Sequence, residues 1–160
     1  MVQLRVRDLM TTQVITVKPT DIVRQAVIKM ALDNVTGAPV VDNRSHVLGV
    51  ISQTDILRLI LKYQDKLDEE IHSEHLLSQP MDTDSQSDDM NNINREFSSM
   101  KVEDIMVRSI LYTTPDAEVV EALRMMMEMD VNRLPVLEQG ILVGTISRSD
   151  IIFAIYKKKV

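Results

Sequence analysis

The sequence predicts an α+β protein in which one β-α-β-β-α unit is used twice. Residues 36–55 recur as residues 132–150, with apolar runs, a proline, a glycine and a final Ser-x-x-Asp in the same order. Pro39 lies 96 residues before Pro135, whereas Gly49 lies 95 residues before Gly144. One residue is therefore lost between the copies, within a turn, and a structural duplication tolerates a change of length there.

Composition and charge exclude several classes of protein. The 160 residues are 44% hydrophobic and 26% charged, as in a globular protein. The net charge of −6 argues against general nucleic-acid binding. Cysteine is absent, which excludes a disulfide, a thiolate nucleophile and a cysteine-based zinc site. The chain has no apolar signal core and no stretch long enough to span a bilayer, so we expect a cytoplasmic protein without a membrane partner.

The first unit covers residues 1–61, and local patterns predict its elements in order. Residues 14–17 are a β-branched run stopped by Pro19, which predicts a strand, and Thr20 is the expected N-cap of the next helix. Apolar residues at helical spacing predict that helix, and they are Val23, Ala26, Val27, Met30 and Ala31. Residues 38–41 and 47–51 predict a hairpin, and a second helix is expected from Ser52 through Leu61.

The second unit, residues 101–160, repeats these steps. Residues 110–113 form the extended run before Pro115, and Asp116 takes the place of Thr20 as the expected N-cap. The apolar stripe of the helix is rebuilt by Val119, Ala122, Leu123, Met126 and Met127. Residues 134–137 and 141–146 predict the hairpin, and residues 147–156 predict the last helix.

Residues 62–100 connect the two units and have no counterpart in the repeat. Residues 62–77 lack Gly and Pro and keep spaced apolar residues, so we expect them to extend the preceding helix. Residues 78–94 have the composition of a flexible acidic loop, and residues 80–92 are expected to be mobile and dispensable. Ile93, Phe97 and Met100 are expected to pack as a short helical turn.

The repeated pattern resembles a tandem pair of CBS domains, a family named for cystathionine β-synthase. The matching segments are Val-Arg-Asp-Leu-Met and Val-Glu-Asp-Ile-Met at the start of each unit (6–10 and 102–106), the prolines of the hairpins, and the closing Gly-x-Ile-Ser-x-x-Asp (49–55 and 144–150). Each motif alone is weak, but their order and spacing occur twice. No catalytic or DNA-binding domain fits in residues 62–100, so the chain resembles a stand-alone CBS pair.

The resemblance implies a fold and a function. The two repeats would pack around a pseudo-twofold axis and form two clefts, each able to take AMP, ADP, ATP or S-adenosylmethionine. The chain would then be a regulatory ligand-sensing module, not an enzyme, with no required cofactor. It would form a homodimer and act on a regulated protein that the sequence does not identify. The alternative is a structural dimerisation module whose clefts bind no physiological nucleotide.

The Ser-x-x-Asp segments have two compatible interpretations. By spacing alone, Ser52 with Asp55 and Ser147 with Asp150 are capping boxes at helix N-termini. The same helix ends are anion sites, and a carboxylate there offers acceptors to ribose hydroxyls. The resemblance assigns Asp55 and Asp150 to the ribose hydroxyls, and it places Ser52, Thr54, Ser147 and Ser149 near ribose and phosphate.

Two arginines are the candidate phosphate ligands, because guanidinium is always charged and pairs with two oxygens at once. Arg133 lies in Asn-Arg-Leu-Pro-Val, similar to the family's His-Arg-x-Pro-Val, and the first repeat has Gly37 there. Arg148 corresponds to Gln53. The residues that the resemblance places at the ligand are Thr16, Val17, Pro19, Gly37, Ala38, Pro39, Ser52, Thr54, Asp55, Tyr112, Thr113, Arg133, Leu134, Pro135, Ser147, Arg148, Ser149 and Asp150.

A metal site is not expected. His72 and His75 have the spacing of one helix face, with Glu69 and Glu74 nearby. Without cysteine or a fixed third ligand, this cluster is interpreted as a solvated face.

Overall fold

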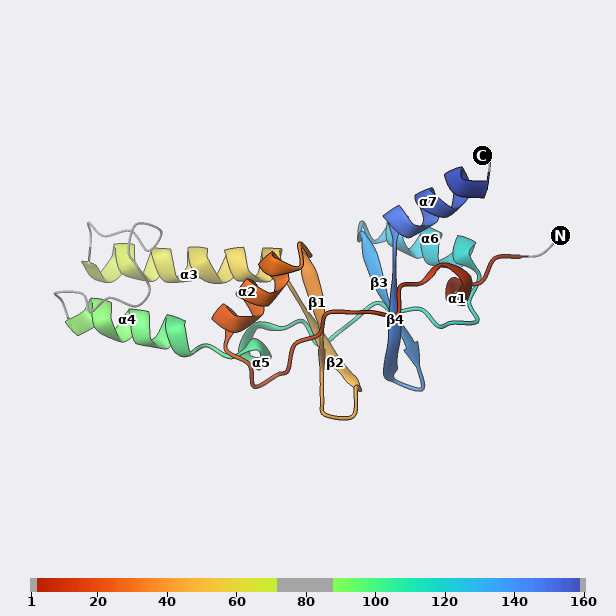
Figure 1. Ribbon diagram of the computed structural model, residues 1–160. Coiled ribbons are helices and arrows are strands. Elements are labelled where there is room, and N and C mark those ends of the chain that lie inside the picture. Colours follow the sequence, from red (N-terminus) through yellow and green to blue (C-terminus); the bar gives the residue numbers. More distant parts are fainter. Residues whose placement is uncertain (1–2, 72–87, 159–160) are drawn as a thin grey trace.

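The structure, a computed structural model, describes residues 3–71 and 88–158. Two lobes of mixed helix and strand lie side by side, and each is built around a two-stranded antiparallel sheet (Figure 1). This confirms the α+β class and the repeated unit. Among the described residues, no helix is both long and apolar enough to cross a membrane.

The first lobe follows the predicted order. It contains α2 (Val23–Leu32), the hairpin of β1 (Gly37–Val41) and β2 (Val47–Ser52), and α3 (Gln53–Ile71). The extended run before Pro19 adds to the sheet through one parallel bridge, in which the Val17 N–H donates to the Pro39 carbonyl at 3.1 Å. Val23, Ala26 and Met30 on the predicted stripe are buried in the lobe's core, while Ala31 is exposed.

The second lobe repeats this plan with α6 (Val119–Glu128), β3 (Arg133–Glu138), β4 (Ile141–Ser147) and α7 (Arg148–Lys158). The matching parallel bridge joins Thr113 to Val136. Both hairpins carry an irregularity of register, after Val40 in β1 and after Val136 in β3. The two lobes therefore repeat each other down to the position of this irregularity.

Each repeat sends its leading helix into the core of the other lobe. Val6 of α1 (Val6–Leu9) is fully buried in the core of the second lobe, and its N–H donates to the Ala117 carbonyl at 2.9 Å. Val102 of α5 (Val102–Ile105) is fully buried in the core of the first lobe, and its N–H donates to the Asp21 carbonyl at 2.8 Å. The exchange ties the two lobes into one unit.

This exchange also explains why both expected N-caps are wrong. Helix α2 begins at Val23 and α6 at Val119, beyond Thr20 and Asp116. The first helical N–H groups are satisfied by the crossing chain instead of by a capping side chain. The Val23 N–H donates to the Met100 carbonyl at 2.8 Å, and the Val119 N–H donates to the Leu4 carbonyl at 3.1 Å.

The crossing segments press against the sheets at two glycines. Thr11 and Thr145 exchange two backbone hydrogen bonds of 2.8 and 2.9 Å. A Cβ on the neighbouring Gly144 would meet the Thr11 carbonyl oxygen at 2.8 Å, and one on Gly49 would meet the Val107 carbonyl oxygen at 2.6 Å. Only glycine allows so close an approach of two backbones.

The connecting segment forms a helical hairpin that extends away from the sheets (Figure 1). Helix α3 continues to Ile71, which confirms the expected extension up to the last described residue, and α4 runs over Asp88–Ser99. Tyr63 and Phe97 pack edge to face with ring centroids 5.2 Å apart, next to fully buried Leu67. The hairpin thus adds its own apolar contacts to the first core.

The acidic-loop assignment of residues 78–94 is therefore wrong over 88–94, which belong to α4. The short helical turn expected around Phe97 is the end of this longer helix. Residues 72–87, which include most of the segment expected to be mobile, lie outside the described residues.

Candidate functional site

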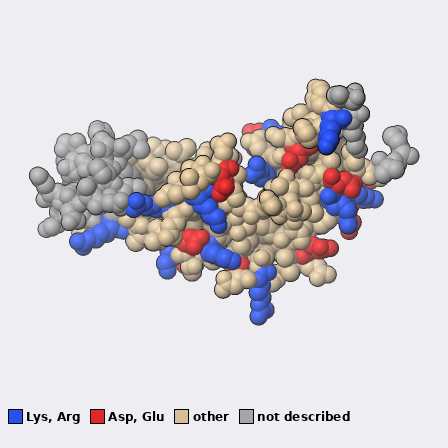
Figure 2. Space-filling view, viewed as in Figure 1, with Lys and Arg blue, Asp and Glu red and all other residues tan. Residues whose placement is uncertain are grey.

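A cleft of about 660 Å³ lies between the two lobes, and each lobe contributes one wall. In the space-filling view the surface dips between the two halves of the molecule, and charges of both signs are scattered over this face (Figure 2). The first lobe and its leading segment contribute Thr11, Gln13, Val14, Ile15, Asp33, Val35, Thr36, Gly37, Ala38, Pro39, Val50, Ser52, Gln53 and Thr54. The second contributes Asp130, Val131, Asn132, Arg133, Pro135, Thr145, Ser147 and Asp150.

The cleft brings together half of the residues expected at the ligand. They come from the β-strands and the N-termini of the helices that follow them, and they are Gly37, Ala38, Pro39, Ser52, Thr54, Arg133, Pro135, Ser147 and Asp150. All four strands contribute lining residues, so the open edges of both hairpins border the cleft.

The other expected residues lie outside the lining. They are Thr16, Val17, Pro19, Asp55, Tyr112, Thr113, Leu134, Arg148 and Ser149. Val17 and Leu134 are 1% exposed and belong to the two cores. Thr113 is buried where it bridges to Val136, whereas Tyr112 is half exposed.

Sequence reasoning missed the turns that lead into β1 and β3. Asp33, Val35, Thr36 and residues 130–132 line the cleft just before each hairpin. Asn34 and Asp130 occupy equivalent places and both have positive φ, 54° and 51°. Asn and Asp tolerate this conformation best among non-glycine residues, so the repeated turn after each predicted helix was a usable signal. Residues 13–15 line the cleft because the leading segment crosses between the lobes, and no local sequence pattern predicts this crossing.

Both Ser-x-x-Asp segments form the predicted capping boxes. In the second lobe the Ser147 N–H donates to the Asp150 carboxylate at 2.9 Å, and the Asp150 N–H donates to the Ser147 hydroxyl at 3.1 Å. In the first lobe the Ser52 hydroxyl also donates to the Asp55 carboxylate at 2.9 Å. Within the described chain, the Ser147 hydroxyl makes no such donated bond, so its proton remains available to a ligand.

The two candidate arginines differ in their surroundings. Arg133 begins β3, is exposed and lines the cleft. Arg148 is directed back into its own lobe, where Nη2 donates to the Met126 carbonyl at 3.0 Å and lies 3.4 Å from an Asp130 carboxylate oxygen. Its Nε is buried and has no partner among the described residues. Arg148 thus joins the end of α6 to the turn before β3.

The charged residues of the cleft set what it can bind. Three carboxylates, from Asp33, Asp130 and Asp150, face one guanidinium, from Arg133. A phosphate could be held near Arg133 or at the N-termini of α3 and α7, where the helix dipole is positive, and only the α7 side has a cation in the lining. The carboxylates of the cleft can accept hydrogen bonds from the hydroxyl groups of a ligand.

The groups with clearly shifted pKa values lie outside the cleft. Burial, followed by a hydrogen bond with Glu96, raises the pKa of Tyr63 to about 12. Hydrogen bonds from Lys66 and Tyr63 lower the pKa of Glu96, and backbone donors lower that of Asp42. No cluster of three or more potential metal ligands occurs in residues 3–71 and 88–158. His72 and His75 lie outside the described residues.

Comparisons with known sequences identify the repeat. The family model of the CBS domain matches residues 6–62 and again residues 102–157. An uncharacterized protein of Methanocaldococcus jannaschii is 27% identical over 153 residues, covering 94% of this chain and 90% of that protein. The inosine-5′-monophosphate dehydrogenase of the same organism is also 27% identical over 146 residues, but this chain spans only 22% of that enzyme.

Solved structures share the whole fold. CBSX2 in complex with AMP is 25% identical, with a TM-score of 0.71 and coverage of 98% of both chains. CBSX2 from Arabidopsis thaliana, 23% identical, has a TM-score of 0.70 over 99% of this chain and 98% of that one. A CBS domain pair in complex with 5′-methylthioadenosine and S-adenosyl-L-methionine is 17% identical, with a TM-score of 0.69 over 98% of this chain and 99% of that one.

Proposed function

The chain belongs to the CBS domain family, and we propose that it is a regulatory module that binds an adenosine-type ligand between its two repeats. The observation that carries this proposal is the cleft of about 660 Å³ whose walls come from both lobes. It is large enough for a nucleotide-sized ligand. The likeness to an AMP-bound CBS protein over nearly the whole chain supports the same conclusion.

Each part of such a ligand has a matching group in the cleft. The carboxylate of Asp150 accepts hydrogen bonds from the ribose hydroxyls, and the Ser147 hydroxyl is free to donate a further bond. Arg133 holds the phosphate, because guanidinium presents paired donors to phosphate oxygens. The adenine lies against the aliphatic surface of Ile15 and Pro39. Tyr112 and Thr16 lie outside this cleft, and the proposal assigns them no contact with the ligand.

Regulation follows from the way the lobes are joined. The exchanged helices α1 and α5 and the paired hairpin tips hold the lobes together, and the Val47 N–H donates to the Gly140 carbonyl at 3.1 Å. A ligand that touches both walls changes the preferred angle between the lobes. We propose that a regulated protein, or a second copy of the chain, responds to this angle in the cytoplasm. No catalytic step, metal or further cofactor is part of the proposal.

A structural dimerisation module remains the alternative, and one observation favours a dimer in either case. Helices α3 and α7 leave large apolar side chains exposed. Leu57 and Leu61 on α3 are 59% and 63% exposed, and Ile152 and Ile155 on α7 are 56% and 45% exposed. Apolar faces of this kind mark protein contacts.

A thermal-shift titration separates the two functions. AMP, ADP, ATP and S-adenosylmethionine are added at up to millimolar concentration, with GMP as the matched control. A ligand that binds the folded state raises the melting temperature as its concentration passes the Kd. We expect at least one adenosine compound to raise the melting temperature by several degrees and GMP to have no effect. No shift with any adenosine compound would favour the structural module.

A further inference from the structure

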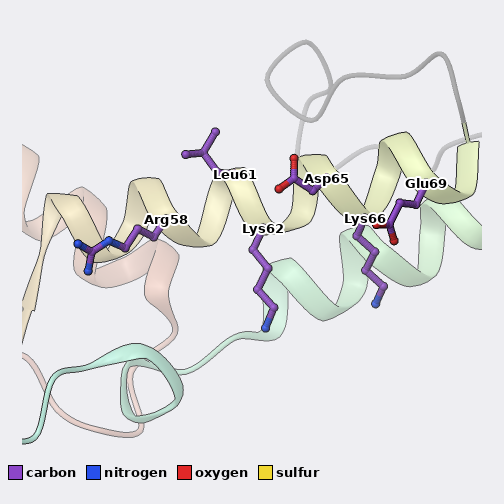
Figure 3. Close-up of a pocket in the computed structure, with 6 residues that line it drawn as sticks. All are labelled: Arg58, Leu61, Lys62, Asp65, Lys66 and Glu69. Carbon is purple, nitrogen blue, oxygen red and sulfur yellow. The ribbon is translucent and has the colours of Figure 1, made fainter.

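The exposed face of α3 carries a line of four charges that the cleft does not use. Figure 3 looks onto this face, where Arg58, Lys62, Asp65 and Glu69 follow one another along the helix. At 100° per residue these four positions fall within about 60° of one another. All four are exposed, and among the described residues Lys62 alone has an electrostatic partner, Glu96 of α4, whose pKa it helps to lower. We call them the α3 charge stripe.

The order of the signs helps α3 only in part, through the opposite charges of Lys62 and Asp65, which are spaced i, i+3. Glu69 lies in the last described turn of α3, where the helix dipole disfavours an anion. The pairs Arg58 with Lys62 and Asp65 with Glu69 are spaced i, i+4, where like charges repel. The neighbouring Lys66, in contrast, is already paired with Glu96 of α4 at 3.1 Å.

The same order is self-complementary in an antiparallel arrangement. When two copies of α3 run in opposite directions, a single register places Arg58 opposite the partner's Glu69 and Lys62 opposite the partner's Asp65. Both pairings are centred at the same point, midway between Tyr63 and Gln64, so they form together. A twofold axis through that point makes each pairing occur twice, which is the rule for a symmetric dimer.

An apolar residue next to the stripe completes the surface. Leu61 is 63% exposed and lines the same shallow groove of about 410 Å³ as the four charges. In Figure 3, Leu61 and Asp65 project to one edge of the helix, and Lys62 and Lys66 project to the other. In the antiparallel register, the two copies of Leu61 come to the same side of the contact and can cover each other.

We propose that a second copy of this chain packs its α3 antiparallel against this α3, with the α3 charge stripe setting the register. This inference names the surface of the proposed homodimer and does not depend on the ligand. Exposed charge pairs add little affinity singly, but they choose the partner and exclude wrong registers through like-charge repulsion. The stripe therefore acts as a specificity element beside the apolar contact of Leu61.

Charge exchange between two variants tests the proposal. One variant carries Arg58→Glu and Lys62→Glu, which makes the stripe wholly acidic, and the other carries Asp65→Lys and Glu69→Lys, which makes it wholly basic. Sedimentation velocity at low salt measures the dimer Kd of each variant and of an equimolar mixture. A control with Arg44→Glu and Arg124→Glu changes two exposed cations elsewhere. Because all these positions are exposed, melting curves should remain within a few degrees of wild type.

We expect the wild type and the control to be dimers. Each charge variant alone should dimerise at least about tenfold more weakly, because every cross-pair becomes repulsive, and the mixture should recover most of the wild-type affinity. The difference should shrink in high salt. A monomeric wild type, charge variants that dimerise as well as wild type, or a mixture that does not recover would each overturn the proposal. Ligand-induced thermal shifts should be the same in all variants, so failure here leaves the cleft proposal standing.

Discussion

Asp55 and Asp150 perform the same local task in different surroundings. Each accepts the N–H of a serine three residues earlier at 2.9 Å, but only Asp150 lines the cleft. We expect Asp55→Ala and Asp150→Ala each to cost about 1 kcal/mol of stability through the lost cap. Only Asp150→Ala should also weaken AMP binding, by tenfold or more. Denaturant melts and calorimetric titrations measure the two effects, and equal loss of AMP affinity in both variants would contradict the assignment.

Arg133 should distinguish phosphorylated ligands from adenosine. Replacing it with Ala removes a charge-assisted bond worth roughly 1.5–3 kcal/mol, so AMP and ATP should bind one to two decades more weakly. Adenosine should bind nearly as before. Arg124→Ala on the outside of α6 is the matched control, since Arg124 is exposed and away from the cleft. An equal loss for adenosine would show that Arg133 supports the fold of the site and does not bind phosphate.

At this scale, half of the residues that the sequence predicted at the ligand line the cleft, and much of the lining was not predicted. Pro39, Ser52, Ser147 and Asp150 could be found because each has an identical counterpart in the other repeat. Ile15 reaches the cleft only because a crossing segment brings it there. The burial of Val17 depends on its parallel bridge to β1, which no local pattern records.

Among the elements, the α3–α4 hairpin is expected to lose folding stability at alkaline pH. The pKa of Tyr63, raised from 10.0 to about 12, lies above its value in the unfolded chain. The neutral phenol therefore adds stability below about pH 10, and this contribution is lost as the pH rises toward 12. We expect wild type to lose up to about 2 kcal/mol more than Tyr63→Phe between pH 9 and pH 12. Urea melts at both pH values measure this difference, and identical pH profiles for the two proteins would contradict it.

Helix α4 shows where element prediction failed and why. Residues 88–94 are polar and acidic, so composition favoured a loop. Helix α4 is held by Phe97, which packs on Tyr63 of α3, more than thirty residues earlier in the chain. Tertiary packing of this kind supplies most helix stability and leaves little trace in local sequence. The hairpins around Pro39 and Pro135 were predicted because their signals are local.

At the scale of the whole molecule, the duplication was predictable but the exchange of the leading helices was not. The motifs at 6–10 and 102–106 mark the start of each repeat equally well whether they pack on their own lobe or on the other. Gly49 and Gly144 are the residues in the sequence that reflect this exchange, since they allow the crossing segments to lie directly on β2 and β4.

Gly49→Ala and Gly144→Ala test that crossing. In each variant the added Cβ would lie under 3.0 Å from a carbonyl oxygen of the crossing segment, so the backbones must separate. We expect each substitution to cost about 1–3 kcal/mol through overpacking and to weaken ligand binding by changing the angle between the lobes. Ser109→Ala, at an exposed site in the segment that follows α5, is the control. Wild-type melting and AMP affinity in both glycine variants would show that the lobes are not held together at these points.

The central claim is that the cleft between the lobes receives an adenosine-type ligand, and a crystal structure of the protein soaked with AMP tests it most directly. The account predicts density for the nucleotide between β1 and β3, with a ribose hydroxyl within hydrogen-bond distance of the Asp150 carboxylate and the phosphate next to Arg133. An empty cleft at saturating AMP, or AMP bound elsewhere on the surface, would contradict it.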